Sequence, residues 1–408
     1  MKKLDYFNLR ELLLNIIRPD AKQDNILELI DKIGPDLSHW SGLLNMSLNE
    51  RIRPLLYYRF NQLGLFDLDK VIPEPVREIL KKAYETSAAR NIFLRRRLEE
   101  ILHAFHGRDI KVILLKGAIA LMEDLYPDKN LRIMCDLDLL VPKAKLSEAG
   151  DVLKELHYLL QEEHKDGRPQ IISKSSLLTI EVKTVPLWAD DAHYLPLEVF
   201  WSNAWRKDKE GLPFLLPSPT DQLYHLLIHE SIEHRWIIDY RIIAIYEIYL
   251  LINLYRDKID FHILLERARK FNLERLFMFY LITAEEKIGP VLPPSVRELF
   301  GSRTERSKYW YDKVLKNPIC FRRASNRFFL ILTTSYSLKS YLKNLYCVLI
   351  KELVITKSDE LIHSHPRLSI YLSFPFFIPL LKVYYVTRRI FLHIIITLLF
   401  LFHRSHAK

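Results

Sequence analysis

Two aspartates, Asp136 and Asp138, occupy alternate positions in the short apolar run from Cys135 to Val141. Alternate side chains of a β-strand share one face, so we expect both carboxylates to point the same way while Leu137 and Leu139 turn into a core. Hard divalent cations such as Mg²⁺ or Mn²⁺ bind to carboxylates together with substrate phosphates. The pair therefore predicts a metal site that handles a phosphate-bearing substrate.

A strand-to-helix turn precedes the aspartates. The apolar run 110–115 predicts a strand and residues 117–122 predict a helix, with Lys116, Gly117 and Ala118 at the turn between them. Backbone N–H groups at the start of a helix attract phosphate, and a glycine lets a ligand approach the backbone closely. We therefore expect these three residues to bind phosphates, and a turn that only joins the two elements is the alternative.

Arg132 stands shortly before the aspartates and is a further candidate for nucleotide binding. An arginine at this place either orients a phosphate or pairs with Asp136 or Asp138. The sequence supports the two roles equally.

A third carboxylate is expected, because phosphoryl-transfer sites usually contain an acid that binds a second ion or activates the acceptor hydroxyl. Glu181 lies in the run 177–183 and Glu198 lies in the run 195–201, and both runs have the composition of a strand. Spacing alone does not choose between these two glutamates.

Four features follow one another along the chain: Leu115-Lys116-Gly117, Tyr126, Arg132 and the run from Asp136 to Val141. In this order they resemble the uncharacterised nucleotidyltransferases of bacteria, a branch of the DNA polymerase beta-like nucleotidyltransferase superfamily. The resemblance covers residues 90–260 and implies a small mixed sheet that carries metal-binding acids. It also implies transfer of a nucleoside monophosphate from a nucleoside triphosphate, taken as ATP, to an unidentified acceptor hydroxyl or phosphate.

The next block of that family is an acid followed by an aromatic residue near a strand end. It resembles Glu198-Val199-Phe200-Trp201, although Phe200 replaces a histidine that is common there. The resemblance thus implies Asp136, Asp138 and Glu198 as the catalytic acids, with the two aspartates as metal ligands.

A later helical block of the family resembles the segment that contains His229 and His234, and an acid further on corresponds to Glu247. One departure concerns the turn, where the wider superfamily places a serine after the glycine to contact phosphate. Ala118 follows Gly117 here. A catalytically weak or inactive nucleotide-binding or scaffold protein of the same fold is therefore the alternative function.

His225 and His229 would share one face of a helix and suggest a zinc hydrolase as a third possibility. The H-E-x-x-H signature fails because Glu233 stands where its second histidine belongs, and the inverted signature fails because Glu230 replaces its first histidine. Histidines in a helix that packs beside the site are the favoured interpretation.

The arrangement of these features predicts an α/β (α+β) fold. A small mixed-sheet nucleotidyltransferase core at 108–210 is flanked by an N-terminal helical region at 1–107 and a helical domain at 211–335, and a basic, apolar helical tail follows at 336–408. With only 10 glycines and no G-x-G-x-x-G or P-loop motif, the chain does not fit a dinucleotide fold or a P-loop ATPase. The 3 cysteines form no C-x-x-C pair, which predicts a cytoplasmic protein without a zinc ribbon or a disulfide framework.

The tail carries most of the excess positive charge, with ten lysines and arginines against three acidic residues in 336–408. Its apolar run 390–402 would form a helix of about 20 Å, short of the roughly 30 Å hydrocarbon core of a bilayer. We therefore expect residues 369–402 either to contact the inner face of the membrane or to pack against the domain or a partner. A nucleic-acid partner is not required.

Overall fold

The computed structural model describes most of the chain up to residue 298. The described residues are 6–34, 37–69, 71–160, 170–173, 179–187, 189–233, 240–271 and 273–298. All of them except residues 273–276 belong to one compact unit. His234 and the tail at 336–408 lie outside the described residues, so membrane contact by residues 369–402 stays a prediction.

A mixed sheet forms the centre of the fold, as the sequence predicts. Its strand order is β3-β4-β5-β2-β1-β7-β6. The pairs β2–β5 and β1–β7 are parallel and the other neighbouring strands are antiparallel. The strands are β1 (Ile113–Leu115), β2 (Asp136–Leu140), β3 (Tyr158–Leu160), β4 (Gln170–Ser173), β5 (Thr179–Lys183), β6 (Trp205–Lys209) and β7 (Leu212–Leu216).

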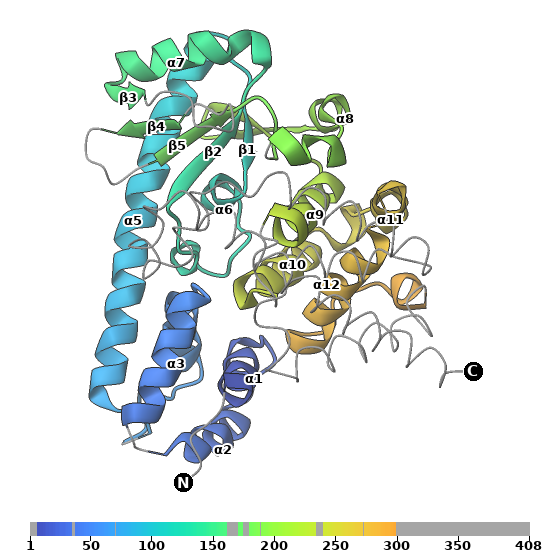
Figure 1. Ribbon diagram of the computed structural model, residues 1–408. Helices are drawn as coiled ribbons and strands as arrows, with labels where there is room; N and C mark the ends of the chain where they lie inside the picture. Colours follow the sequence, from blue (N-terminus) through green and yellow to red (C-terminus); the bar gives the residue numbers. More distant parts are fainter. Residues whose placement is uncertain are drawn as a thin grey trace, which may run out of the picture. The chain divides into compact units, whose positions relative to one another are not determined.

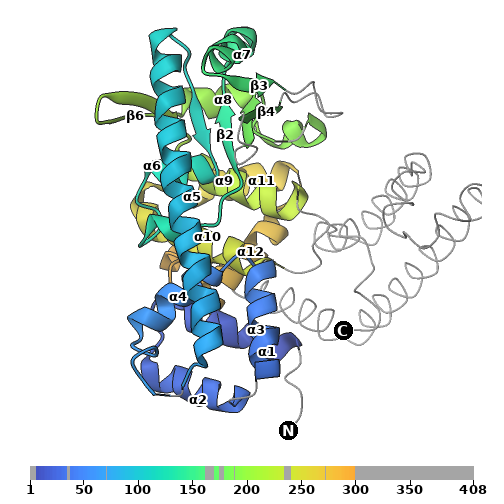
Figure 2. The same ribbon diagram turned by 90° about the vertical axis from the view of Figure 1, so that its left-hand side faces the viewer.

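Helices occupy the chain before the sheet, in agreement with the predicted helical region. They are α1 (Tyr6–Ile17), α2 (Gln23–Ile33), α3 (Leu37–Asn49), α4 (Arg53–Gln62) and α5 (Glu74–Gly107). Helix α5 starts with a proline in its first turn, where the missing N–H is tolerated, and it ends at Gly107. In Figures 1 and 2 this long helix runs past the N-terminal helices and along the sheet.

The hydrophobic core lies between α5 and one face of the sheet. Apolar residues of α5 from Leu94 to Phe105 pack against strand residues such as Leu114, Leu137 and Leu139, and α7 (Leu146–Glu155) adds Ala149, Val152 and Leu153. Because side chains alternate along a strand, the intervening residues of β2 point to the opposite face. The alternation therefore places Asp136 and Asp138 away from the α5 core.

Helices follow the sheet as well, and the first of them begins at Pro219. Ser218 caps the first of them by accepting a hydrogen bond from the backbone N–H of Asp221 at 3.2 Å. These elements are α9 (Pro219–Ile228), the π-helical segment η4 (His229–Glu233), α10 (Ile242–Tyr255), η5 (Arg256–Lys258), α11 (Phe261–Lys270) and α12 (Glu274–Lys287). The predicted mixed α/β fold class is confirmed, whereas the domain boundaries at 107, 210 and 335 stay predictions.

The prediction of a strand at 195–201 is wrong, because residues Leu197–Ser202 form helix α8 directly after Pro196. A short apolar run has no period long enough to separate strand from helix. The remaining short helices of the described part are α6 (Gly117–Met122), η1 (Lys129–Leu131), η2 (Lys143–Lys145) and η3 (Ala189–Tyr194).

The hairpin of β6 and β7 was not predicted, because β6 reads Trp-Arg-Lys-Asp-Lys and lacks apolar alternation. Its turn at Glu210 and Gly211 has φ values of 56° and 80°. Two successive positive φ values are typical of the tight turns that connect hairpins. No helix of the described residues is long and apolar enough to span a bilayer.

Candidate active site

The acids of the site come from two adjacent parallel strands. The register of β2 and β5 places Asp136 beside Thr179, Asp138 beside Glu181, and Leu140 beside Lys183. Paired residues of neighbouring strands point to the same face of the sheet. Three carboxylates and a lysine therefore gather on the face opposite the α5 core.

Asp138 is the buried centre of this cluster, with a side chain only 2% exposed. It forms an ion pair with Lys183, and its Oδ1 lies 3.6 Å from the Nζ of Lys116. Burial by itself would raise the pKa of Asp138, but the charges of Lys116 and Lys183 hold that pKa well below its usual value. Asp138 is therefore a carboxylate that stays ionised.

Asp136 has a different environment although it lies only two residues away. Its carboxylate is half-buried and makes no hydrogen bond or ion pair with the residues that the structure describes. Burial, followed by the negative charge of Asp138, raises the pKa of Asp136. The positive charges of Lys116 and Arg132 oppose this rise but do not cancel it.

Glu181 is the third acid at this place. Its Oε2 lies 2.7 Å from the Nζ of Lys183, which in turn contacts Asp138. Glu198 lies in the first turn of α8, outside the sheet, and its side chain is exposed. The structure therefore brings Glu181 together with Asp136 and Asp138, and it does not place Glu198 on the strand from which the sequence expected it to act.

The turn between β1 and α6 brings Lys116 to the acids. Lys116 has φ of 48° and ψ of −118°, a conformation that strains any residue except glycine. The next residue must be small, because a Cβ on Gly117 would lie 2.6 Å from Nη1 of Arg132 and 2.8 Å from Sδ of Met134. Ala118 is fully buried in the hydrophobic core, so its methyl group packs inward.

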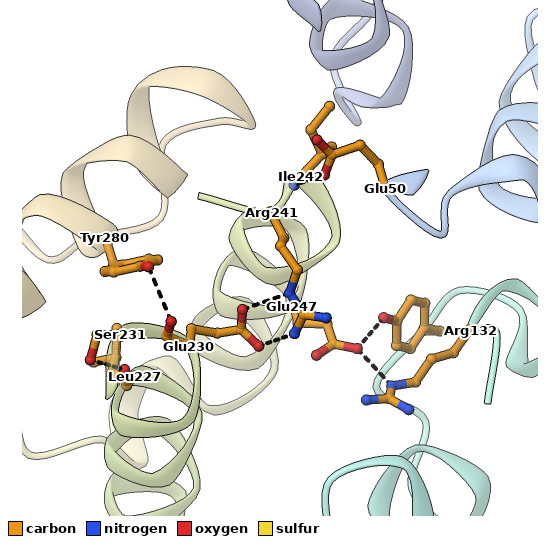
Figure 3. A network of polar contacts seen from close by, with 10 residues as sticks. Glu50, Arg132, Leu227, Glu230, Ser231, Arg241, Ile242, Glu247 and Tyr280 are labelled. Atoms are coloured by element: carbon orange, nitrogen blue, oxygen red, sulfur yellow. Dashed lines mark hydrogen bonds and ion pairs between the residues drawn. The ribbon is translucent and has the colours of Figure 1, made fainter. Parts of the chain in front are cut away.

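Arg132 is held beside this turn by Glu247 of α10, as Figure 3 shows. Its Nε donates to Oε1 of Glu247 at 2.6 Å, and the hydroxyl of Tyr126 donates to the same oxygen at 2.6 Å. Burial would lower the pKa of Arg132, but Glu247 raises it, so the guanidinium stays charged. The ion-pair partner of Arg132 is therefore Glu247 and not either aspartate.

A second pair belongs to the same network. Glu230 of η4 receives two hydrogen bonds from Arg241, one of 2.9 Å from Nε, and Figure 3 shows the pair next to Glu247. Glu50, which follows α3, accepts a hydrogen bond of 2.6 Å from the backbone N–H of Ile242. The start of α10 is thus fixed to both η4 and the N-terminal helices.

The histidines of α9 and η4 have structural surroundings. The Nε2 of His225 lies 3.1 Å from the carbonyl oxygen of Pro186, and its ring stacks on that of His229 with centroids 6.3 Å apart. Among the described residues, no group of three or more histidine, cysteine, aspartate or glutamate side chains is arranged to hold a metal ion. The zinc-hydrolase alternative therefore gains no support from the described part of the chain.

Helix α5 fixes the loop that carries Arg132 and leads into β2. The side-chain amide of Asn91 donates to the carbonyl oxygens of Lys129 and Arg132 at 2.8 and 2.9 Å. Arg90 donates to the carbonyl oxygens of Met134 and Cys135 at 2.5 and 3.1 Å. Neither residue was predicted from the sequence, although an asparagine within an apolar helical face is a detectable signal.

The donor set fits a hard divalent cation at Asp136 and Asp138. Both residues offer carboxylate oxygens on one face, and the carboxylate of Asp136 has no protein partner among the described residues. Magnesium typically takes one or two carboxylates and completes its shell with water and phosphate. Glu181 forms an ion pair with Lys183, which also contacts Asp138, so the two aspartates are the residues that fit the cation best.

Two solved structures resemble the chain in part. One is an antigenic nucleotidyltransferase-like protein from Paracoccidioides brasiliensis, with 15% identity and a TM-score of 0.31 over 45% of this chain and 92% of that one. The other is the antibiotic-resistance factor ANT(2'')-Ia, with 13% identity and a TM-score of 0.30 over 54% of this chain and 99% of that one.

No curated protein matches the chain in sequence. The family model for uncharacterised nucleotidyltransferases matches residues 36–289, which is more than half of the chain and includes the whole sheet. The chain therefore belongs to the family of uncharacterised nucleotidyltransferases.

Proposed function

We propose that this chain is a metal-dependent transferase that moves a nucleoside monophosphate from a nucleoside triphosphate, ATP in the first instance, to a hydroxyl or phosphate of an acceptor. The observation that carries the proposal is the gathering of Asp136, Asp138 and Glu181 on one face of the sheet beside Lys116. Family membership supports the class of reaction.

Asp136 and Asp138 are the residues that would hold Mg²⁺ or Mn²⁺. When bound there, the cation neutralises negative charge on the triphosphate and on the departing pyrophosphate. Asp138 is kept ionised by two lysines, and Asp136 makes no ion pair within the described residues. The carboxylate of Asp138 is therefore held in place, and the carboxylate of Asp136 is available to bind a cation.

Lys116 and Arg132 are the positive groups that we assign to the triphosphate. Lys116 is partly exposed beside Asp138, and the guanidinium of Arg132 is fixed over Gly117 by its Nε contact with Glu247. A fixed guanidinium loses little freedom when it binds phosphate oxygens. Gly117 leaves the space for Arg132, and the backbone N–H of Ala118 completes the proposed phosphate contacts.

Glu181 is the carboxylate that we assign to the acceptor. It takes the proton of the attacking hydroxyl as the new bond to the α-phosphate forms, in the role of a general base. Lys183 lies 2.7 Å from Glu181 and stabilises the ionised carboxylate before the proton arrives. This assignment replaces Glu198 as the third acid.

A matched pair of variants tests the proposal. The purified full chain is incubated with Mg²⁺, each α-labelled nucleoside triphosphate and a cell extract that supplies acceptors, and both pyrophosphate and labelled product are measured. We expect Glu181→Gln to lower the rate by roughly 10² to 10⁴, because general bases contribute about that much. We expect Glu198→Gln to keep the wild-type rate, because Glu198 is exposed on α8.

The reverse result, with Glu198→Gln inactive and Glu181→Gln active, would restore Glu198 as the third acid. Release of no pyrophosphate by the wild type with any nucleotide and extract would reject the transferase function. The alternative is a nucleotide-binding scaffold, which the buried methyl group of Ala118 and the Lys183–Asp138 ion pair favour. Calorimetry that detects tight binding of ATP and Mg²⁺ without turnover would identify that alternative.

A further inference from the structure

Lys183 is a buried lysine at the centre of the candidate site, with a side chain 1% exposed. An ammonium group removed from water costs several kcal/mol unless opposite charges surround it. Two carboxylates do so here, because Nζ contacts Asp138 and lies 2.7 Å from Oε2 of Glu181. Lys183 therefore bridges two of the three acids.

The strand geometry fixes this bridge in place. Lys183 lies two residues after Glu181 on β5, so both side chains point to the same face. Its carbonyl oxygen accepts a hydrogen bond of 2.9 Å from the backbone N–H of Val141, next to β2. The ammonium group thus has little freedom to leave the acids while the sheet is intact.

A positive charge shared by two active-site carboxylates is the arrangement that two-metal sites achieve with one of their ions. In such a site, three carboxylates and two divalent cations have a formal charge of about plus one. Here Asp136, Asp138 and Glu181 stand against Lys116 and Lys183, which leaves a formal charge of minus one. One divalent cation brings this site to the same plus one.

We propose that Lys183 takes the place of the second divalent cation, so that this site binds one metal ion with its nucleotide and not two. The inference rests on the proposed function, since it concerns the acids of the same site. Asp136 and Asp138 remain as ligands for the single cation. The positive charge next to Glu181 and the acceptor is then supplied by the protein itself.

Manganese is the probe for the test, because its electron paramagnetic resonance spectrum counts bound ions and changes when two ions lie within about 4 Å of each other. The full chain is titrated with Mn²⁺ in the presence of an ATP analogue whose α,β-bridging oxygen is a methylene group. We expect one bound Mn²⁺ for each wild-type chain and no signature of a coupled pair. Two bound ions would overturn the inference and leave the proposed function intact, whereas no bound ion would reject both.

The variant Lys183→Ala removes the ammonium and leaves space between Asp138 and Glu181. We expect it to bind two Mn²⁺ ions and to show the coupled spectrum. The control is Lys207→Ala on β6, which removes another lysine–carboxylate pair, with Nζ 3.0 Å from Glu123; three strands separate β6 from β5 in the sheet. We expect the control to keep one Mn²⁺, and a Lys183→Ala protein that folds and still binds one ion would overturn the inference.

Loss of Lys183 also leaves Asp138 and Glu181 without their shared positive charge, so we expect the variant to be less stable than the wild type in the absence of metal. We expect Mn²⁺ to raise the melting temperature of Lys183→Ala by more than it raises that of the wild type, because the ion replaces the missing charge. An equal shift in both proteins would count against the inference. The wild-type stoichiometry decides the question even when the variant does not fold.

Discussion

At the scale of single residues, Asp136 and Asp138 show how two identical side chains on one strand acquire opposite properties. Asp138 faces Lys183 and Lys116, which lower its pKa against the effect of burial. Asp136 is half-buried and close to Asp138, and both effects raise its pKa. A lowered carboxyl pKa marks a charge that stabilises the fold, and a raised one marks a charge that destabilises it.

We expect Asp136→Asn to raise the melting temperature at pH 7 and Asp138→Asn to lower it. The first change removes an unfavourable charge. The second removes one of the two carboxylates that pair with the buried Lys183, and we expect it to lower the free energy of unfolding by about 3–5 kcal/mol. The gain in stability from Asp136→Asn should shrink as the pH falls towards 3.8, the ordinary pKa of an aspartate. The wild-type carboxyl is then protonated and neutral, like the asparagine that replaces it. Thermal unfolding of both variants in metal-free buffer between about pH 4 and pH 8 measures these effects.

Equal destabilisation by both substitutions would show that Asp136 has a partner of its own in solution. The prediction also guides the choice of an inactive variant. Asp136→Asn is expected to lose metal binding and activity without loss of stability, whereas Asp138→Asn would mix the two effects.

The residue types revealed part of this site before the structure did. The alternation of Asp136 and Asp138 with leucines predicted a shared face, which follows from strand geometry alone. The position of Glu181 beside Asp138 depends on which strands are neighbours and in which register, and no local pattern contains that information. The role of Lys183 was not predicted either, because a lysine at a strand end is usually solvated and only the strand order shows that acids surround it.

At the scale of elements, α5 does more than cover the sheet. Its first turns pack against the N-terminal helix α4, and its last turns contribute side chains to the hydrophobic core. Its middle holds the loop before β2 through hydrogen bonds from Arg90 and Asn91. Polar residues in the middle of a buried helical face are costly unless they are hydrogen-bonded. Their presence here is explained by the loop carbonyl groups that they bind.

We expect Asn91→Ala to destabilise the protein by about 1–3 kcal/mol, because it leaves the carbonyl oxygens of Lys129 and Arg132 without their buried donor. The matched control is the next residue of the same helix, Ile92→Ala, where the side chain is 53% exposed against 3% for Asn91. We expect that control to change stability by less than about 0.5 kcal/mol. Urea denaturation of the two variants measures their free energies of unfolding. Equal losses of stability in the two variants would show that Asn91 does not hold the loop.

Element prediction succeeded where alternation or a clear change of pattern marked a segment, as for β2 and for the start of α6 at Gly117. It failed for α8, which is six residues long, and for β6, whose charged residues hide its pairing with β7. Short edge elements derive their conformation from tertiary contacts more than from their own sequence.

At the scale of the whole unit, polar contacts connect the N-terminal helices to the candidate site. Arg10 of α1 contacts Glu50, Glu50 binds the N-terminus of α10, and Glu247 of α10 holds Arg132. The three contacts join residues that are 40, 192 and 115 positions apart in the sequence, so no local sequence pattern could reveal the connection. Helices outside the sheet thus help to position a residue that we assign to phosphate binding.

We expect Glu247→Gln to raise the KM for the nucleoside triphosphate by about 10-fold to 100-fold while kcat changes less. The substitution keeps the size of the side chain but removes the charge that fixes Arg132, and a hydrogen bond between charged groups is worth about 1.5–3 kcal/mol. Glu50→Gln changes the same network one contact further from Arg132, and we expect it to lower stability and to raise KM by less than Glu247→Gln does. Steady-state kinetics and thermal unfolding of both variants separate positioning from general stability, and an unchanged KM in Glu247→Gln would contradict the assignment.

The backbone at Lys116 has a consequence for how this chain could change over time. Glycine would relax the positive φ at this position, but it would also remove the ammonium that lies 3.6 Å from Asp138. A lineage that no longer handles nucleotides would be free to exchange this lysine for glycine and would keep its fold. We therefore expect glycine at residue 116 in relatives of this chain that have lost nucleotide binding.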